Sequence, residues 1–488
     1  MLFRSGIERT SVADVSAYHE PTEPFHNASS AVCAGYPPAT SNTSVIATSA
    51  TTPATKTRIG RKVFMSWGEA RRRTGAYTCR PMHARAQTAP RTAGTVAEDP
   101  HRWRMLALIA LAELLGMSVW FAANAVAPQL AVRWVLTQGE TGWLSTVVQL
   151  GFVLGTALAA LLNLADTLPS RWYFTGAAVA AAAANAALLI APTYGWALVC
   201  RLLTGVCLAG VYPPAMKMAA TWFVGRRGLA IGIVVGALTI GKATPYLVHA
   251  IPGAGVTPVV LCASAAALLA ALLVAAAYHD GPTPFPRRPF TLALVGTVLR
   301  DKRYQEVLGG YSGHMLELYA CWVWIPAFLA ASAIASGHSI ESSAGWVNAL
   351  SFIVLAAGAI GCVIGGELAD RLGPVRLVVL AMFVSGSCAL LTPLVFGASS
   401  ALLVPLLLIW SVSVIADSAQ FSTLVTRVVE PHAIGTALTL QTSIGFLLTT
   451  ITIQLVPVVV AVVGWRFAFP MLALGPALGI AAIRRLRV

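Results

Sequence analysis

The chain has 488 residues, of which 57% are hydrophobic and only 11% are charged. A soluble domain carries about 25% charged residues, so this composition indicates a membrane protein. The formal net charge of +14 does not indicate nucleic-acid binding, because Lys and Arg fall in an N-terminal tail and in short loops. The eight cysteines show neither disulfide-like nor metal-ligand spacing, so we expect no disulfide framework, no metal site and no cofactor.

Residues 1–100 are rich in Ser, Thr, Ala, Pro and Arg and lack apolar periodicity, so we expect a disordered cytoplasmic tail. Transit peptides are also rich in Arg, but the acidic residues near the start of this stretch argue against one. Translation from Met65 or Met82 is another explanation for the change in composition. Whether this stretch belongs to the mature protein therefore stays open.

From Trp103 onward, apolar runs recur, each long enough to cross about 30 Å of hydrocarbon as a helix. They predict twelve spans near residues 104–130, 142–163, 172–191, 196–217, 228–250, 255–278, 306–331, 344–366, 376–396, 401–425, 434–457 and 465–483. Short loops on the side of the tail carry seventeen Lys and Arg, whereas the opposite side carries only Arg133 and Arg466. This distribution predicts that both termini lie in the cytoplasm.

The segment 280–305 is basic and begins with a Pro-rich run, and it follows the sixth predicted span. We interpret it as a cytoplasmic linker between one six-helix bundle at 101–279 and another at 306–488. Several residue pairs lie 204 positions apart, which favours duplicated halves, with coincidence as the alternative. The pairs are Glu113 and Glu317, Trp120 and Trp324, Asp166 and Asp370, and Gly241 and Gly445.

The charged turn between the eighth and ninth spans reads Gly366-Glu-Leu-Ala-Asp370-Arg371-Leu-Gly373. Charged groups are unfavourable in lipid, so this turn must lie at a membrane surface, and its glycines permit a tight turn. The run Gly-x-x-x-Asp-Arg-x-Gly resembles the loop signature of the major facilitator superfamily, the twelve-helix secondary transporters. The corresponding loop of the first half keeps Asp166 but lacks the glycines and the arginine of the motif. A cytoplasmic turn without a gating role is the alternative.

The resemblance implies an all-α membrane fold of two pseudo-symmetric six-helix bundles. It also implies that the first, fourth, seventh and tenth spans line a central cavity. The polar and aromatic candidates for a solute and proton pathway in these spans are Glu113, Trp120, Asn124, Arg201, His314, Glu317, Trp324 and Asp417. The candidate gating residues are Asp166, Gly366, Asp370, Arg371 and Gly373. We expect a monomer that binds a small solute and protons.

Two buried carboxylates stand out among these candidates. Glu113 and Glu317 both come near the middle of the bilayer when residues are counted at about 1.5 Å each. A carboxylate in a low-dielectric cavity can hold a proton near neutral pH, so both are candidates for proton coupling. The alternative is that they pair with Arg201 or Lys242 and only hold the bundle together.

The remaining candidates each have a structural alternative. Arg201 precedes spaced glycines, similar to the family's fourth helix, which implies proton or anion handling; a salt bridge is the alternative. Asp417 is a gate or a helix-pairing residue, and His314 is included because a carboxylate follows one turn later. Trp120 and Trp324 would stack on the solute or close an outer gate, with interfacial anchoring as the alternative.

We therefore expect a secondary active transporter in the plasma or inner membrane. It would move a small polar or anionic solute by alternating access, coupled to protons. An efflux carrier and a non-transporting sensor are the alternatives, although the fifth span lacks the Gly-Pro pair of the family's antiporter motif. The sequence has no GxxxxGK[ST], HExxH or GxSxG motif, which argues against a primary pump and a membrane enzyme. We expect no enzymatic activity.

Overall fold

The computed structural model describes residues 99–223, 226–283 and 290–486. Within these ranges every regular element is a helix and no strand occurs. The predicted all-α membrane fold is therefore confirmed. The expectation of a disordered tail falls on residues 1–98, which lie outside the described ranges.

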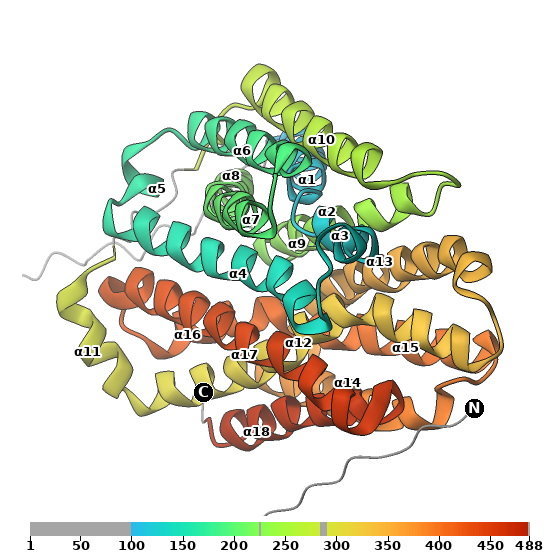
Figure 1. The fold of residues 1–488 in the computed structure, drawn as a ribbon. Coiled ribbons are helices and arrows are strands. Elements are labelled where there is room, and N and C mark those ends of the chain that lie inside the picture. Colours follow the sequence, from blue (N-terminus) through green and yellow to red (C-terminus); the bar gives the residue numbers. More distant parts are fainter. Residues whose placement is uncertain (1–98, 224–225, 284–289, 487–488) are drawn as a thin grey trace, which may run out of the picture. The chain divides into compact units, whose positions relative to one another are not determined.

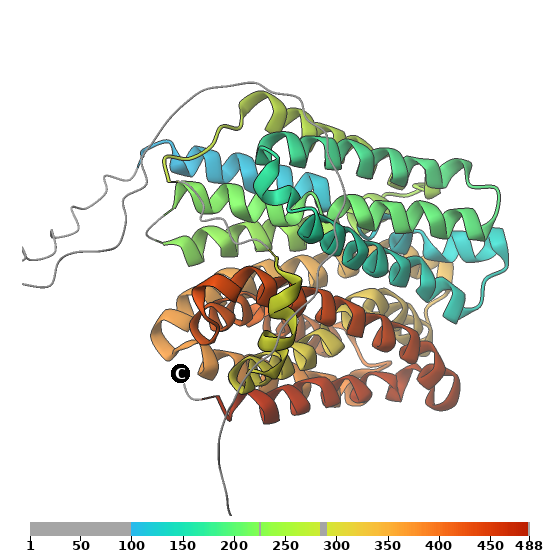
Figure 2. The same ribbon diagram turned by 90° about the vertical axis from the view of Figure 1, so that its left-hand side faces the viewer.

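The helices form two groups in chain order, which Figures 1 and 2 show on opposite sides of the described region. The first group comprises α1 (Arg102–Met117), α2 (Ala122–Ala125), α3 (Ala127–Trp134), α4 (Gln138–Leu161), α5 (Leu164–Thr167), α6 (Ser170–Ala186), the 3-10 helix η1 (Ala187–Ile190), α7 (Tyr194–Leu208), α8 (Tyr212–Trp222), α9 (Arg227–His249) and α10 (Val256–Ala277). The second group comprises α11 (Leu292–Arg300), α12 (Lys302–Ala335), α13 (Ile340–Leu372), α14 (Pro374–Val395), α15 (Ser400–Ala416), α16 (Ser418–Val428), η2 (Pro431–Ala433), α17 (Ile434–Ala468), η3 (Phe469–Ala473) and α18 (Leu474–Ile483).

Ten helical segments of the described residues are long and apolar enough to cross a membrane. The prediction of twelve spans differs from this at two places. The first predicted span is interrupted after α1, which has only 16 residues. The last two predicted spans follow one another without a loop and count as one segment, but the helix is broken between them at Gly464, whose φ of 73° and ψ of 169° are not helical. Glycine adopts a positive φ without steric cost. The count of twelve stays a prediction.

Local side-chain bonds define where the long helices begin. Before α4, the backbone N–H of Thr137 donates to the Glu140 carboxylate at 2.8 Å, and the N–H of Glu140 donates to Thr137 Oγ1 at 3.2 Å. This reciprocal capping box satisfies two N–H groups that the first turn leaves unpaired. Asp301 caps α12 similarly, with Oδ1 accepting from the N–H of Arg303 at 2.8 Å.

The predicted linker 280–305 has more structure than expected. It contains α11, and α12 already begins at Lys302. The N–H of Thr291, at the start of α11, donates to Thr436 Oγ1 at 2.9 Å, which ties this helix to α17. The apolar run in α11 is too short to cross a membrane, and charged residues flank it in the sequence. For this reason the sequence predicts a linker here.

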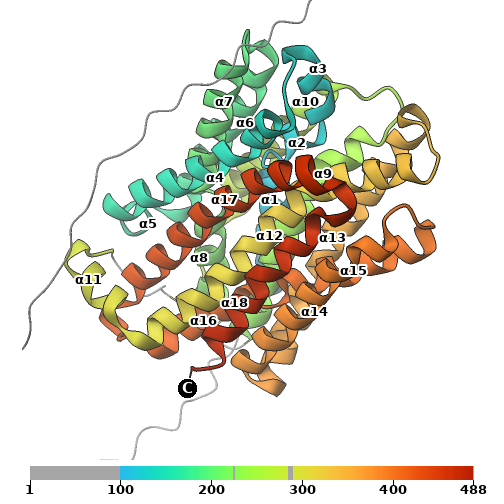
Figure 3. The same cartoon turned by 60° about the horizontal axis from the view of Figure 1, so that its bottom comes forward.

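Two helix pairs join the groups: α9 packs along α13, and α4 packs along α17. In the first pair, a Cβ added to Gly232 would lie 3.1 Å from the carbonyl oxygen of Cys362. A Cβ on Gly236 would lie 3.4 Å from that of Ala359. Spaced glycines of this kind let two membrane helices approach closely. Within the second group, α12 packs against both α17 and α18, as Figure 3 shows.

Candidate functional site

Lys242 of α9 is buried where the two groups of helices meet. Its Nζ lies 4.0 Å from the ring centroid of Trp120, 4.7 Å from that of Tyr319 and 5.5 Å from that of Trp322. The same Nζ donates a hydrogen bond to the Tyr319 hydroxyl. Trp120 belongs to the first group, whereas the other two rings lie on α12. We call these four residues the lysine cage, an arrangement that cation–π attraction stabilises.

Two phenylalanines extend the lysine cage across the interface. Phe152 of α4 and Phe446 of α17 have ring centroids 4.6 Å apart. The Phe446 ring lies 5.2 Å from Tyr319 and 6.0 Å from Trp120. Since α4 and α17 form one of the two pairs that join the groups, any movement of one group against the other changes these contacts.

Glu113 of α1 is fully buried, and neither carboxylate oxygen has a hydrogen-bond partner in the described part of the chain. The next residue, Leu114, has its carbonyl against Gly241, which precedes Lys242, so α1 and α9 are in close contact at the level of the two charges. Lys242 is the cation whose charge acts on Glu113, but the two form no ion pair. Gln149 of α4 likewise has both amide atoms buried without a partner among the described residues. Buried polar groups of this kind need a functional or ligand-based explanation.

Arg201 of α7 supports the turn that carries Trp120. Its guanidinium donates to the carbonyl oxygen of Val119 at 3.0 Å and to that of Trp120. Further bonds reach the carbonyl oxygen of Leu144 at 3.4 Å and Oδ1 of Asn185 at 3.3 Å. These donors replace the helical partners that carbonyls lose where α1 ends. Arg201 forms no ion pair within the described ranges, so the alternative of a salt bridge to a glutamate is not what the structure shows.

Glu317 of α12 has very different surroundings from Glu113. Its Oε1 accepts from Trp410 Nε1 at 2.7 Å, and its Oε2 accepts from Ser385 Oγ at 2.8 Å. Trp410 lies on α15 and Ser385 on α14, so this carboxylate joins three helices. The two glutamates therefore occupy corresponding positions in the sequence but not equivalent environments.

His314 and Asp417 lie together near Glu317. His314 Nδ1 lies 2.9 Å from Asp417 Oδ1, and both side chains are buried. Asp417 stands where α15 ends and α16 begins, and His314 Nε2 has no partner among the described residues. Three predicted site residues of the second group therefore lie close together: His314 and Glu317 on α12, and Asp417 directly after α15.

A cavity of about 1160 Å³ lies between the groups, at the end that the charge pattern predicts to be extracytoplasmic. Its lining includes Asn124 and Trp324 from the predicted set. Asn124 donates to Ser145 Oγ, and Trp324 Nε1 donates to the carbonyl oxygen of Ile453 at 2.9 Å. Trp324 therefore fixes α12 to α17 rather than anchoring at a lipid interface.

The lysine cage lies about one helical turn below this cavity. Tyr246, which lines the cavity, follows Lys242 by four residues on α9. A turn of α-helix rises about 5.4 Å, so Lys242 lies about that far along α9 from the lining of the cavity. The Tyr246 hydroxyl is buried and has no partner in the described ranges.

The predicted gating loops show few interactions of the kind a gate would need. Asp166 forms an ion pair with Lys217 at 3.9 Å. Asp370 and Arg371 are exposed and form no ion pair with another described residue. Gly373 has a φ of 84° and separates α13 from α14, as expected for a tight turn.

Gly366 of the motif makes no close approach to a neighbouring helix. The nearest atom to a Cβ added there would be the Gly228 carbonyl oxygen at 3.9 Å. The preceding Gly365 is the tight position, since its Cβ would overlap the carbonyl oxygen of Ala416 on α15. Both glycines lie inside α13, and the one that permits the contact is not the glycine of the motif.

Sequence reasoning missed four residues that the structure brings into the site. Tyr319 and Trp322 lie on α12 away from the side of Glu317, so helical spacing did not group them with it. For Lys242 the sequence suggests only pairing with one of the two glutamates, not a place among aromatic rings. Gln149 is a polar residue in an apolar span, and that contrast alone marks it as a candidate.

Comparison with known proteins agrees with this architecture. The Major Facilitator Superfamily profile matches residues 109–453. The niacin transporter NiaP of Acinetobacter baylyi is 33% identical over 95 residues, which is 19% of this chain and 21% of that protein. The matched stretch thus spans about a fifth of that relative's length.

Solved structures with the same fold include the nucleoside transporter NupG, with a TM-score of 0.61 and 14% identity over 79% of this chain and 100% of that one. A bacterial homologue of the human lysosomal transporter Spinster, inward-facing and unoccupied, has a TM-score of 0.56 and 15% identity over 80% of this chain and 95% of that one. These identities establish the fold alone. The profile match covers most of the chain, and the chain therefore belongs to the major facilitator superfamily of membrane transporters.

Proposed function

We propose that this protein transports a small aromatic monocarboxylate by alternating access, with the lysine cage as its binding site and Glu113 as its proton carrier. The observation that supports the proposal is the buried Lys242 ammonium, ringed by aromatic faces from both groups of helices about one helical turn from the cavity lining. In secondary transporters the solute binds near the bilayer midplane, between the repeats.

The chemistry of the cage favours an anion that carries a ring. An ammonium buried without a carboxylate partner has a strong preference for an anionic ligand. In the conformation described, the Tyr319 hydroxyl accepts the hydrogen bond from Lys242, and a solute carboxylate would take over that position. The Trp120 and Trp322 rings offer flat faces on which an aromatic solute stacks.

The NiaP relative supports this class of solute. Niacin is a pyridine ring that carries one carboxylate, so it has the charge and the flat face that the lysine cage would recognise. The similarity covers only 95 residues, so we use niacin as a probe of the class and not as the assigned solute.

Glu113 is better suited than Glu317 to carry a proton. An ionised carboxylate that is buried without partners is strongly unfavourable, so Glu113 gains from binding a proton whenever no cation or solvent reaches it. Glu317 accepts two hydrogen bonds that stabilise its charged form in place. Proton coupling is therefore assigned to the first group of helices, close to the lysine cage.

Uptake into proteoliposomes tests the proposal. Labelled nicotinate should accumulate when the outside is acidic, and unlabelled benzoate should compete with it. Neutral nicotinamide should compete at least tenfold less well, because it lacks the carboxylate. Lys242→Gln should abolish uptake, whereas Lys302→Gln, at an exposed lysine in the first turn of α12, should retain it. Equal competition by nicotinamide and nicotinate would contradict the assignment of Lys242 to the carboxylate.

A further inference from the structure

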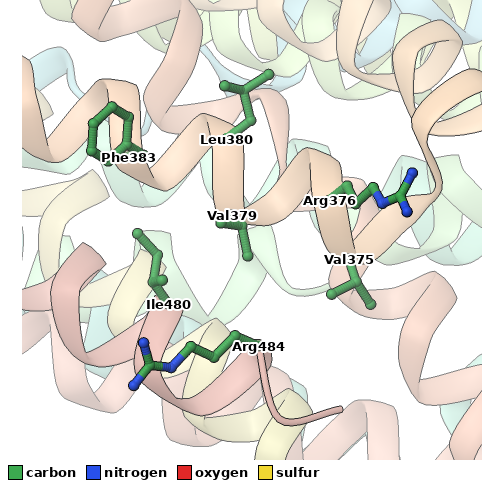
Figure 4. A pocket seen from close by; sticks show the side chains of 7 residues that line it. All are labelled: Val375, Arg376, Val379, Leu380, Phe383, Ile480 and Arg484. Atoms are coloured by element: carbon green, nitrogen blue, oxygen red, sulfur yellow. The ribbon is translucent and has the colours of Figure 1, made fainter. Parts of the chain in front are cut away.

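A groove on the outside of the second group lies apart from the transport site. It has a volume of about 430 Å³ and runs between α14 and α18, which pack side by side. Figure 4 shows its wall of apolar side chains, among them Val379, Leu380, Phe383 and Ile480. It also shows that each helix contributes one arginine, Arg376 from α14 and Arg484 from the residue that follows α18.

The apolar wall of the groove belongs to the lipid-facing surface. Phe383 is 65% exposed and Leu380 is 45% exposed, and both lie in a helix that is long and apolar enough to span a membrane. Exposed apolar side chains on a spanning helix face acyl chains, because nothing else in the bilayer core can cover them. The groove is therefore shaped for a hydrocarbon chain.

The two arginines come from neighbouring ends of α14 and α18, and Figure 4 shows their guanidinium groups pointing away from each other. Arg376 is in the first turn of α14. Neither Arg376 nor Arg484 forms an ion pair or a side-chain hydrogen bond with another described residue. The acidic residues closest in sequence, Glu367 and Asp370, are exposed and do not neutralise them. Both side chains are exposed and can rotate toward the groove, where each guanidinium could donate paired hydrogen bonds to a phosphate.

We propose that this groove binds one anionic glycerophospholipid, with its phosphate on Arg376 and Arg484 and an acyl chain along Leu380 and Phe383. The distribution of Lys and Arg predicts that this end of the helices faces the cytoplasm, where anionic lipids gather and basic clusters between helices bind their headgroups. The bound lipid links the start of α14 to the end of α18 and so stabilises the second group. The site is independent of the proposed solute and of proton coupling.

The test uses the full-length protein purified in detergent. Titration with phosphatidylglycerol should raise its melting temperature and give bound lipid in native mass spectrometry, whereas phosphatidylcholine should bind at least fivefold more weakly. Arg376→Gln combined with Arg484→Gln should weaken phosphatidylglycerol binding at least fivefold. Arg427→Gln, which removes an exposed arginine outside the groove, should not.

Two further measurements identify the ligand, and both use the unmodified protein. Binding of phosphatidylglycerol to the unmodified protein should weaken as salt is raised, because the contact is with exposed charges. Glycerol 3-phosphate alone should not raise the melting temperature. Equal binding of the two lipids, unchanged binding in the double variant, or full stabilisation by glycerol 3-phosphate would each overturn the proposal, the last by indicating a site for soluble anions.

Discussion

The Lys242 ammonium lies 4.0 Å from the centroid of the Trp120 ring, although the two residues are more than a hundred positions apart in the chain. Trp120 occupies this place because α1 ends at Met117 and the chain turns before α2 begins. Arg201 holds that turn through the carbonyl oxygens of Val119 and Trp120. The break in the helix after Met117 thus places the Trp120 ring next to the Lys242 ammonium.

Replacement of Trp120 by Leu should weaken solute binding about tenfold. The lost interaction between the ring and a buried cation is worth about 1–2 kcal/mol, and about 1.4 kcal/mol corresponds to a tenfold change in affinity. Trp120→Phe should retain most of the binding because it keeps an aromatic face. Counterflow of labelled nicotinate measures the apparent affinity. Trp172→Leu, at a tryptophan that is 58% exposed, is the matched control and should behave like the unmodified protein.

Glu113→Gln should separate proton coupling from solute binding. Glutamine has the shape of the protonated acid but cannot release a proton, so uptake driven by a pH gradient should fall at least tenfold while counterflow at equal pH continues. Initial rates with and without the gradient measure the difference. Glu430→Gln, at an exposed glutamate, should leave both rates unchanged. A Glu113→Gln protein that still responds fully to the gradient would remove this residue from the coupling mechanism.

Glu317→Ala should destabilise the protein more than Glu113→Ala. Loss of Glu317 leaves the Trp410 Nε1–H buried without its acceptor and removes the bond from Ser385. Such a buried donor costs about 1–3 kcal/mol, in addition to the lost packing. Glu113 has no hydrogen bond to lose in the described ranges. Thermal unfolding of the two variants in detergent checks the order, and a lower melting temperature for Glu113→Ala would be the opposite result.

Two neighbouring glycines should differ in their tolerance of a methyl group. Gly365→Ala places a Cβ against the carbonyl oxygen of Ala416, so α13 and α15 must move apart, at a cost of about 1–3 kcal/mol. Gly366→Ala meets nothing closer than 3.9 Å and should be tolerated, although this is the glycine of the loop motif. Melting temperatures of the two variants decide between the packing role and the motif role. A larger fall in melting temperature for Gly366→Ala than for Gly365→Ala would indicate that the motif glycine has the greater structural role.

Several properties of this protein follow from the sequence alone. A run of apolar residues long enough to cross lipid must be a helix there, because the backbone finds no other hydrogen-bond partners, and this predicted the all-α membrane fold. The turn around Asp370 carried the family resemblance, which the profile match over residues 109–453 confirmed. The cost of burying charge identified Glu113, Arg201, Glu317 and Asp417 as residues that need an explanation.

The tertiary structure decided what each of these residues contacts. Glu113 and Glu317 occupy matching positions 204 residues apart, yet one has no partner among the described residues and the other joins α12 to Trp410 and Ser385. The lysine cage combines α9, α12 and the turn before α2, and such a set depends on how each helix is rotated and where it breaks. Periodicity describes one helix at a time. The contacts that form a site depend on packing between helices that are distant in sequence, and only the folded chain determines that packing.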